Sequence, residues 1–213
     1  MNVLPPDLPQ SLDSGMNLMD KLVREDRIEE CVFTGECYAG ENLKGLDALR
    51  CRFVKCDFSG CNFEQAGFRD TAFEACDFSN CNFTKAAFTR VVFQGCKLMG
   101  ADFVEASLRH VRFYDASGGY VNFADSKVQD TAFEKSRLPN AAFLRCRLTA
   151  CFDSCDMQQS LFEQTPLKDV DLRTCKLQGF QTTLHDLKGA IVTASQAADL
   201  AVLLGLVIKE RDD

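Results

Sequence analysis

The chain has 213 residues, 46% of them hydrophobic, and a formal net charge of −7 from 31 acidic and 24 basic side chains. No apolar run reaches the roughly 18 residues that a membrane-spanning helix requires. Residues 1–18 lack the basic and then apolar pattern of a secretory signal, so we expect a cytoplasmic protein with no membrane partner. The acidic balance predicts no direct nucleic-acid binding, which depends on Lys and Arg replacing counterions.

Residues 1–27 contain three prolines before position 10 and show no periodicity, so we expect an N-terminal leader or cap there. From residue 28 onward the chain repeats every five residues, as in CRFVK CDFSG CNFEQ AGFRD from residue 51. The repeat keeps one phase to Leu148, loses one residue before Phe152, and continues to about residue 192. Seventeen of the 18 phenylalanines occupy the third position, and only Phe180 does not. This periodicity predicts one repeat domain over residues 28–192.

The five-residue period fits neither an α-helix nor an alternating strand. In each repeat, the third residue and the one two positions earlier can point inward, as strand side chains two apart do, while the others face solvent and form a corner. Four such sides close a square coil of 20 residues. The predicted fold is an all-β solenoid, a right-handed quadrilateral β-helix of about eight coils and roughly 40 Å, given a strand spacing of about 4.8 Å.

The inward column of small residues accounts for most of the cysteines. Ten of the 12 lie two residues before a repeat centre, where Ala, Ser, Thr and Val otherwise occur: Cys31, Cys51, Cys56, Cys61, Cys76, Cys81, Cys96, Cys146, Cys155 and Cys175. A free cysteine packs as a small apolar side chain, so we expect buried thiols and no metal site or cofactor. Cys37 and Cys151 lie outside this column, and the sequence does not indicate their role.

The sequence predicts that the protein is not an enzyme. It contains no nucleophile elbow, no glycine-rich phosphate loop and no histidine pair with metal-ligand spacing. His110 is expected on an outward corner and His185 near the last coil.

Residues 193–213 depart from the repeat and predict a C-terminal module. Thr193 and Gln196 form a capping box that opens a helix to about Leu204, Gly205 is a stop signal, and a short β-like tail follows. Because a solenoid end exposes core side chains and unpaired backbone, the module is either a simple cap or a dimer interface. The residues expected in a homodimer interface are Ala197, Leu200, Ala201, Leu204, Leu206, Val207 and Ile208.

The segments CDFSGCNF and CDFSNCNF resemble the A(D/N)LXX consensus of pentapeptide-repeat proteins. The helix followed by Leu-Gly-Leu-Val-Ile is similar to the C-terminal module of the topoisomerase-protecting members, the Qnr-like and the albicidin- and microcin B17-resistance-like proteins, where it joins two protomers end to end. This resemblance implies a homodimer that binds DNA gyrase. The unbroken phase to Leu148 excludes the loop insertions of some Qnr proteins; the largest irregularity is Gly118, which replaces an apolar centre.

Residues 20 apart share a side of the coil, so each side can be assigned a charge. The side centred on Phe63 has five outward acids and two bases, whereas the next side, centred on Phe68, has five bases and two acids. An acidic rod about 80 Å long as a dimer would imitate roughly two turns of DNA at about 34–36 Å per turn.

Two functions remain open at this point. The first is an acidic DNA mimic that binds DNA gyrase, with topoisomerase IV as a second target, and protects it from a poison, giving quinolone or other antibiotic resistance or self-immunity. The residues expected to contact the enzyme are Asp102, Glu105, Asp125, Asp153, Asp156, Glu163, Asp169, Asp171 and Asp186. The second is a structural or scaffolding repeat protein without a topoisomerase partner.

Overall fold

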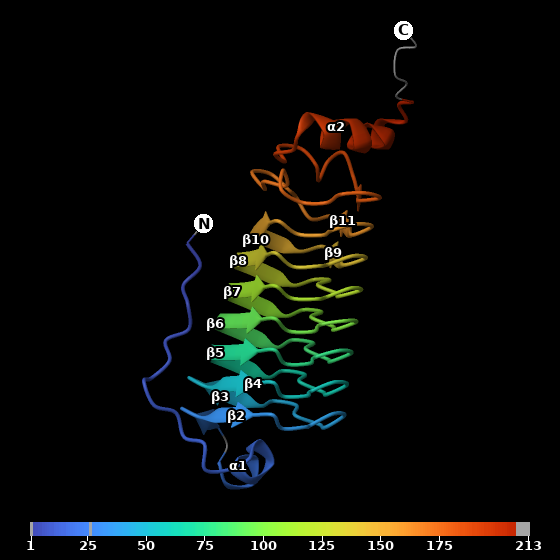
Figure 1. The fold of residues 1–213 in the computed structure, drawn as a ribbon. Helices are drawn as coiled ribbons and strands as arrows, with labels where there is room; N and C mark the ends of the chain where they lie inside the picture. Colours follow the sequence, from blue (N-terminus) through green and yellow to red (C-terminus); the bar gives the residue numbers. More distant parts are fainter. Residues whose placement is uncertain (1, 26, 208–213) are drawn as a thin grey trace.

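The computed structural model describes residues 2–25 and 27–207, which form a β-solenoid with a short helix near each end (Figure 1). Nearly every strand pairs in parallel with the segment 20 residues later, for example Phe68 with Phe88 and Phe88 with Leu108. The predicted quadrilateral β-helix is therefore confirmed. Its strands are β1 Ile28–Glu29, β2 Val32–Thr34, β3 Asp47–Leu49, β4 Arg52–Val54, β5 Gly67–Glu74, β6 Ala87–Gln94, β7 Ser107–Tyr114, β8 Lys127–Glu134, β9 Ala142–Leu144, β10 Arg147–Asp153, β11 Leu161–Glu163 and β12 Gln181–Thr182.

The four sides of the coil are named here after the central residues Phe63, Phe68, Phe73 and Phe78. Strands β5 to β8 and β10 each run along the Phe68 side, turn the corner and continue along the Phe73 side, where they form most of a nine-stranded sheet. The other two sides pair mainly through isolated bridges, such as Asp57 with Asp77. Two sides of the rod are therefore continuous parallel sheet.

Most repeats end at a corner residue with left-handed backbone, although Thr174 and Leu184 do not have this conformation. The φ of the left-handed corners ranges from 47° at Asp130 to 64° at Asp169 among non-glycine residues. This conformation is costly for residues other than glycine. At most corners the backbone N–H donates to a carbonyl of the next coil, as Arg50 N does to Arg69 O at 2.9 Å. Hydrogen bonds between stacked coils therefore stabilise a left-handed backbone conformation that is unfavourable for these residues in isolation.

Phenylalanine stacks fill the centre of the rod. On the Phe63 side, successive rings from Phe63 to Phe162 are stacked with centroid distances between 4.4 and 5.1 Å. Phe180, the one phenylalanine outside the third position, is also buried and continues this column 5.1 Å from Phe162. It occupies the small-residue position of its repeat, and the half-buried Thr182 takes the centre.

The residue lost between Leu148 and Phe152 is a corner residue. The register of β10 on β8 shifts between Thr149 and Ala150, so that Asp130 has no counterpart in the following coil. The inward columns then resume with Ala150 and Phe152, both buried. The loss of phase in the sequence is thus a β-bulge that shortens one coil without opening it.

The leader lies against the outside of the coils. Asp13 bridges Cys31 of the first coil, and Figure 1 shows the preceding residues running beside the stacked coils toward the N-terminus. The N–H of Asp7 donates to Asp70 Oδ1 at 3.0 Å. Further along, residues 3–6 and the Phe73-side residues Val91, Val92 and Arg112 enclose a hollow of about 140 Å³. The leader therefore covers part of the Phe73 side.

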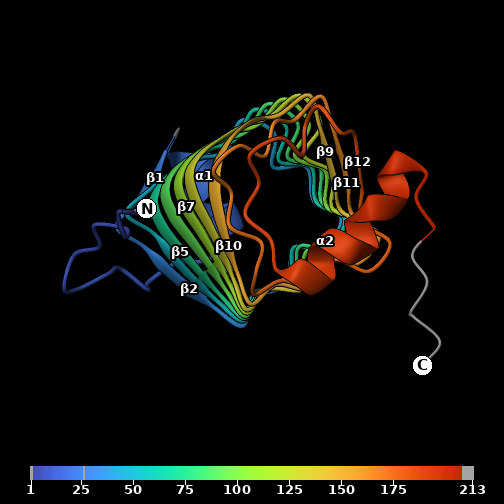
Figure 2. The same cartoon turned by 90° about the horizontal axis from the view of Figure 1, so that it is seen from above.

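Both ends of the solenoid are capped by short helices. Helix α1, Leu18–Arg24, covers the first coil with the fully buried Leu18, whose N–H donates to Tyr38 Oη at 3.1 Å. Helix α2, Ala194–Leu200, lies across the last coil (Figure 2) and continues as the 3₁₀ helix η1, Ala201–Leu204. None of the helices in the described ranges is long and apolar enough to cross a membrane.

Candidate partner-binding surface

Opposite charges on neighbouring coils pair along the rod. Six ion pairs join side chains 20 residues apart: Arg27 with Asp47 at 2.6 Å, Lys44 with Glu64 at 3.0 Å, Asp70 with Arg90 at 2.5 Å, Asp77 with Lys97 at 3.1 Å, Lys85 with Glu105 at 3.7 Å, and Asp125 with Arg145 at 2.6 Å. This spacing places both partners at equivalent positions of adjacent coils. Exposed pairs of this kind contribute little stability. They do cancel charge on the surface that a partner would meet.

The acidic stripe expected on the Phe63 side is largely neutralised by these pairs. Glu105 is paired with Lys85, and Asp125 accepts two hydrogen bonds from the Arg145 guanidinium, which keeps the pKa of Asp125 below its usual value. Asp102 has no basic partner in the described chain, but it is half-buried and accepts from the Val104 N–H at 3.1 Å. The stripe therefore presents less net negative charge than its composition suggested.

The acids of the last coils are more available. Asp153, Asp156, Glu163 and Asp169 have no basic side chain at ion-pair distance among the described residues, and all but Asp156 are exposed. Asp153 accepts from Thr174 Oγ1 at 3.1 Å, and Asp156 accepts from the Gln158 N–H at 3.2 Å. Four of the predicted contact acids are thus unpaired on the last coils, where the bases Lys168, Lys176 and Lys188 also have no acidic partner among the described residues.

Two more of the predicted contact acids, besides Glu105 and Asp125, have internal partners. Asp171 is paired with Arg173 at 2.7 Å, and hydrogen bonds from this side chain lower the pKa of Asp171 to about 2. Asp186 is buried, which corrects its placement as a surface contact. Its Oδ2 accepts from the Gln164 N–H at 2.9 Å and from Thr183 Oγ1 at 2.7 Å. Asp186 therefore stabilises a turn of the last coil and does not face a partner.

The C-terminal module caps the rod. Its capping box is formed as predicted, with the Thr193 side chain and Gln196 bonded reciprocally. The Gln196 side-chain N–H groups also donate to Leu172 O at 2.8 Å and to Cys175 O at 2.9 Å, and Leu200 is buried beside them. These bonds satisfy carbonyl groups that the end of the solenoid would otherwise leave unpaired. Leu200, expected in a dimer interface, instead packs on its own chain.

Of the other residues predicted for the dimer surface, four are exposed and Ala201 is half-buried. Ala197, Ala201 and Leu204 line a hollow of about 160 Å³ together with Leu184, Leu187, Val192 and Leu200. Leu204 is 58%, Leu206 55% and Val207 82% exposed. Leu206 and Val207 form no strand, contrary to the expected β-like tail, and Ile208 lies outside the described residues. The helix is also shorter than expected, because η1 has replaced its last turn before Gly205.

Sequence reasoning missed three exposed apolar residues at this end: Leu184, Ile191 and Val202. Leu184 falls on a corner position and Ile191 on an outward position of the last repeats, where polar residues are usual. An apolar residue at a corner or outward position of a repeat is therefore the sequence pattern that could have identified this exposed apolar surface.

The cysteines lie as predicted, with ten buried thiols, an exposed Cys37 and a half-buried Cys151. Burial raises the pKa of the Cys51 thiol to about 12 and that of Cys61 to about 11. Within the described ranges, His, Cys, Asp and Glu side chains form no cluster of three or more that could hold a metal. His110 occupies the predicted corner, with φ 55°.

Residues 66–143 match the family model described as a pentapeptide repeat region. A search among curated proteins finds no match.

Among solved structures, a trypsin-treated form of QnrB1, a plasmid-mediated fluoroquinolone resistance protein, is 24% identical, with 86% of this chain and 92% of that chain covered and a TM-score of 0.49. HetL, a pentapeptide repeat protein involved in heterocyst differentiation regulation from the cyanobacterium Nostoc sp. strain PCC 7120, is 17% identical, with 83% and 97% covered and a TM-score of 0.28. The family model thus identifies a pentapeptide repeat region at residues 66–143, and backbone pairing between coils continues the β-helix on both sides of it, from Asp13 to Ile191.

Proposed function

We propose that this protein binds DNA gyrase, with topoisomerase IV as a second target, as an acidic DNA-mimicking rod, and protects the enzyme from a poison. The observation that carries the proposal is the set of unpaired carboxylates on the last coils, namely Asp153, Asp156, Glu163 and Asp169. A fixed array of negative charge is attracted to the basic groove in which an enzyme binds DNA. The resemblance of residues 193–208 to the C-terminal module of topoisomerase-protecting proteins supports the same partner.

The proposal includes a homodimer joined at the C-terminal ends. Leu204, Leu206 and Val207 expose apolar surface next to the α2 cap, and contact with a second copy would remove it from water. Such a junction would place the carboxylates of both last coils on either side of the dimer centre. The result is a rod of roughly 80 Å, assuming about eight coils per protomer spaced about 4.8 Å apart, with these four carboxylates of each protomer near the middle.

A titration of the protein into a gyrase supercoiling assay, with and without a gyrase poison, tests the proposal. We expect that supercoiling in the presence of the poison recovers over part of the titration, and that fewer cleavage complexes are trapped. The absence of any effect with several poisons would contradict the proposal and favour a scaffolding protein.

A charge-reversed variant tests the surface. Glu163→Lys with Asp169→Lys should weaken gyrase binding, because both carboxylates are exposed and unpaired. The matched control is Glu41→Lys with Asp115→Lys, which changes the net charge equally at exposed positions distant from the last coil. Asp115 and Asp169 are both left-handed corners, with φ 51° and 64°, so the two variants carry similar backbone strain. Equal loss of binding in both variants would show that only overall charge matters.

A further inference from the structure

The Phe68 side carries a row of bases that the rest of the rod does not neutralise. Arg69, Arg109, Lys127 and Arg147 are all exposed, and none has an acidic partner at ion-pair distance among the described residues. Of the acids on this side, Asp70 is taken by Arg90 and by the Asp7 N–H of the leader, and Asp47 is taken by Arg27. Asp130, at the corner, is half-buried, whereas Asp169, at the corner one coil beyond Arg147, is exposed and unpaired among the described residues. We call the four free bases the basic row.

Two members of the basic row face each other. Arg147 is in direct register with Lys127 on the adjacent strand. Like charges directly opposite on neighbouring strands are destabilising, and six other positions of this rod hold opposite charges at the same 20-residue spacing. The alignment of Lys127 with Arg147 is therefore unfavourable, and neither base has an acidic partner at ion-pair distance among the described residues. An anion bound from outside would offset this repulsion.

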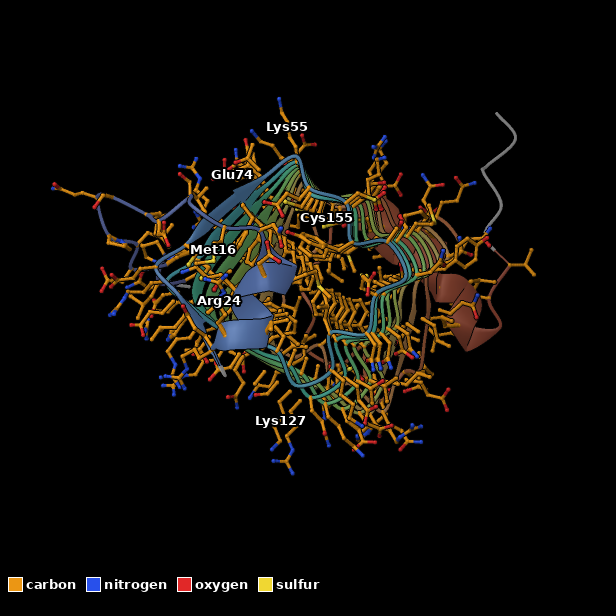
Figure 3. The ribbon with its side chains drawn as sticks, turned by 90° about the horizontal axis from the view of Figure 1, so that it is seen from below. Met16, Arg24, Lys55, Glu74, Lys127 and Cys155 are labelled. Carbon is orange, nitrogen blue, oxygen red and sulfur yellow. The ribbon has the colours of Figure 1, made fainter. Side chains whose placement is uncertain are left out.

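The surface around the basic row is open and contains few apolar groups. Figure 3 shows Lys127 pointing outward from the coils, and the described leader covers the neighbouring Phe73 side instead. The outward residues between the bases are small or polar: Gly67, Ala87, Thr89, Ser107 and Gln129. A protein interface is usually centred on aromatic or other large apolar residues, and this side offers none between its bases. A linear polyanion fits it better than a folded protein does.

We infer that the basic row binds the phosphodiester backbone of duplex DNA. From Arg69 to Arg147 the row spans about four coils, or roughly 19 Å at a spacing of about 4.8 Å. One strand of B-DNA presents about five or six phosphates over that length, given one per 3.4 Å. Three of the four bases are arginines, whose guanidinium forks match phosphate oxygens.

The proposed contact between the basic row and DNA does not depend on whether DNA gyrase is a partner of this protein. The net charge of −7 predicts that the isolated protein binds DNA weakly and only at low salt. If the proposed function holds as well, the rod would present its free acids to the enzyme and its basic row to a DNA segment held by that enzyme. The four free acids lie on four different sides of the last coils, and Asp169 lies on the Phe68 side itself, one coil beyond Arg147.

Fluorescence anisotropy of a labelled 20-base-pair duplex, measured from 20 to 150 mM salt, tests the inference without gyrase. Four phosphate contacts predict a slope of log K against log salt of about −3.6, because each contributes about −0.9. Replacing Lys127→Gln and Arg147→Gln should reduce the slope to about half. Because these changes remove a repulsion, the variant should also melt at the same or a higher temperature.

The control variant Lys44→Gln with Lys97→Gln removes the same charge from bases that are ion-paired on other sides. Its slope should match that of the parent protein. No duplex binding at 20 mM salt, or an equal loss in both variants, would overturn the inference. Binding to phosphatidylglycerol vesicles without binding to the duplex would also overturn it, because the row would then recognise a membrane.

Discussion

Gly118 offers a test of how neighbouring coils share core volume. It stands where Leu98 and Leu138 stand one coil earlier and later, and Val121 stands where those coils have Ala101 and Ala141. A Cβ added to Gly118 would lie 2.8 Å from Val121 Cγ2 and 3.0 Å from Leu138 Cδ2. The larger Val121 therefore fills the space that the missing side chain leaves.

Restoring the repeat consensus at Gly118 alone should destabilise the protein. Gly118→Leu overpacks a buried site, which typically costs about 1–3 kcal/mol, and Val121→Ala alone leaves a cavity that costs about 1–3 kcal/mol. The double variant copies the Leu–Ala arrangement of both adjacent coils. We expect its stability to fall within about 1 kcal/mol of the parent, which corresponds to a coupling of at least about 1 kcal/mol between the two sites.

Urea unfolding followed by far-UV circular dichroism measures all four proteins of this cycle. Where the dependence of the unfolding free energy on urea concentration is unchanged, a shift of the unfolding midpoint reports a change in stability. A change in that dependence would instead indicate altered cooperativity, which repeat proteins can show. A neutral or stabilising Gly118→Leu would refute the packing argument. So would a double variant whose loss equals the sum of the two single losses.

Two further predictions concern the thiols. In the native protein, Ellman's reagent should label Cys37 quickly and Cys151 slowly, and the ten inward thiols should react only after unfolding; rapid labelling of more than two would show that the coils open. Because the pKa of Cys51 is raised to about 12 and that of Cys61 to about 11 by burial, the folded state holds these protons more tightly than the unfolded state does. Stability should therefore be unaffected by these thiols below about pH 8.5 and should fall above it, by up to about 1.4 kcal/mol per pH unit for each thiol. Cys51→Ala with Cys61→Ala should flatten that fall, and an unchanged pH profile would contradict the assignment.

The sequence predicts the fold because the five-residue period determines which side chains point inward. Phe103 and Cys81 occupy repeat positions whose direction the strand alternation sets, and both are buried as expected. The missing residue before Phe152 was also visible, since a lost corner shifts every later centre by one place. The capping box at Thr193 and Gln196 was recognisable because it depends on residues three positions apart.

Only the tertiary structure decided which surface charges remain free. Composition gave the Phe63 side an acidic stripe, but the partners of Glu105 and Asp125 are chosen by distances between coils and by side-chain reach. Asp186 shows the same limit, because its repeat position faces outward while the turn at Thr183 folds over it. The leader has no sequence period that could predict its path. Its course along the Phe73 side depends on contacts with strands some 60 residues later in the chain, such as the hydrogen bond from Asp7 to Asp70. A local period fixes the direction of each side chain, whereas its partners depend on what the folded chain brings within reach.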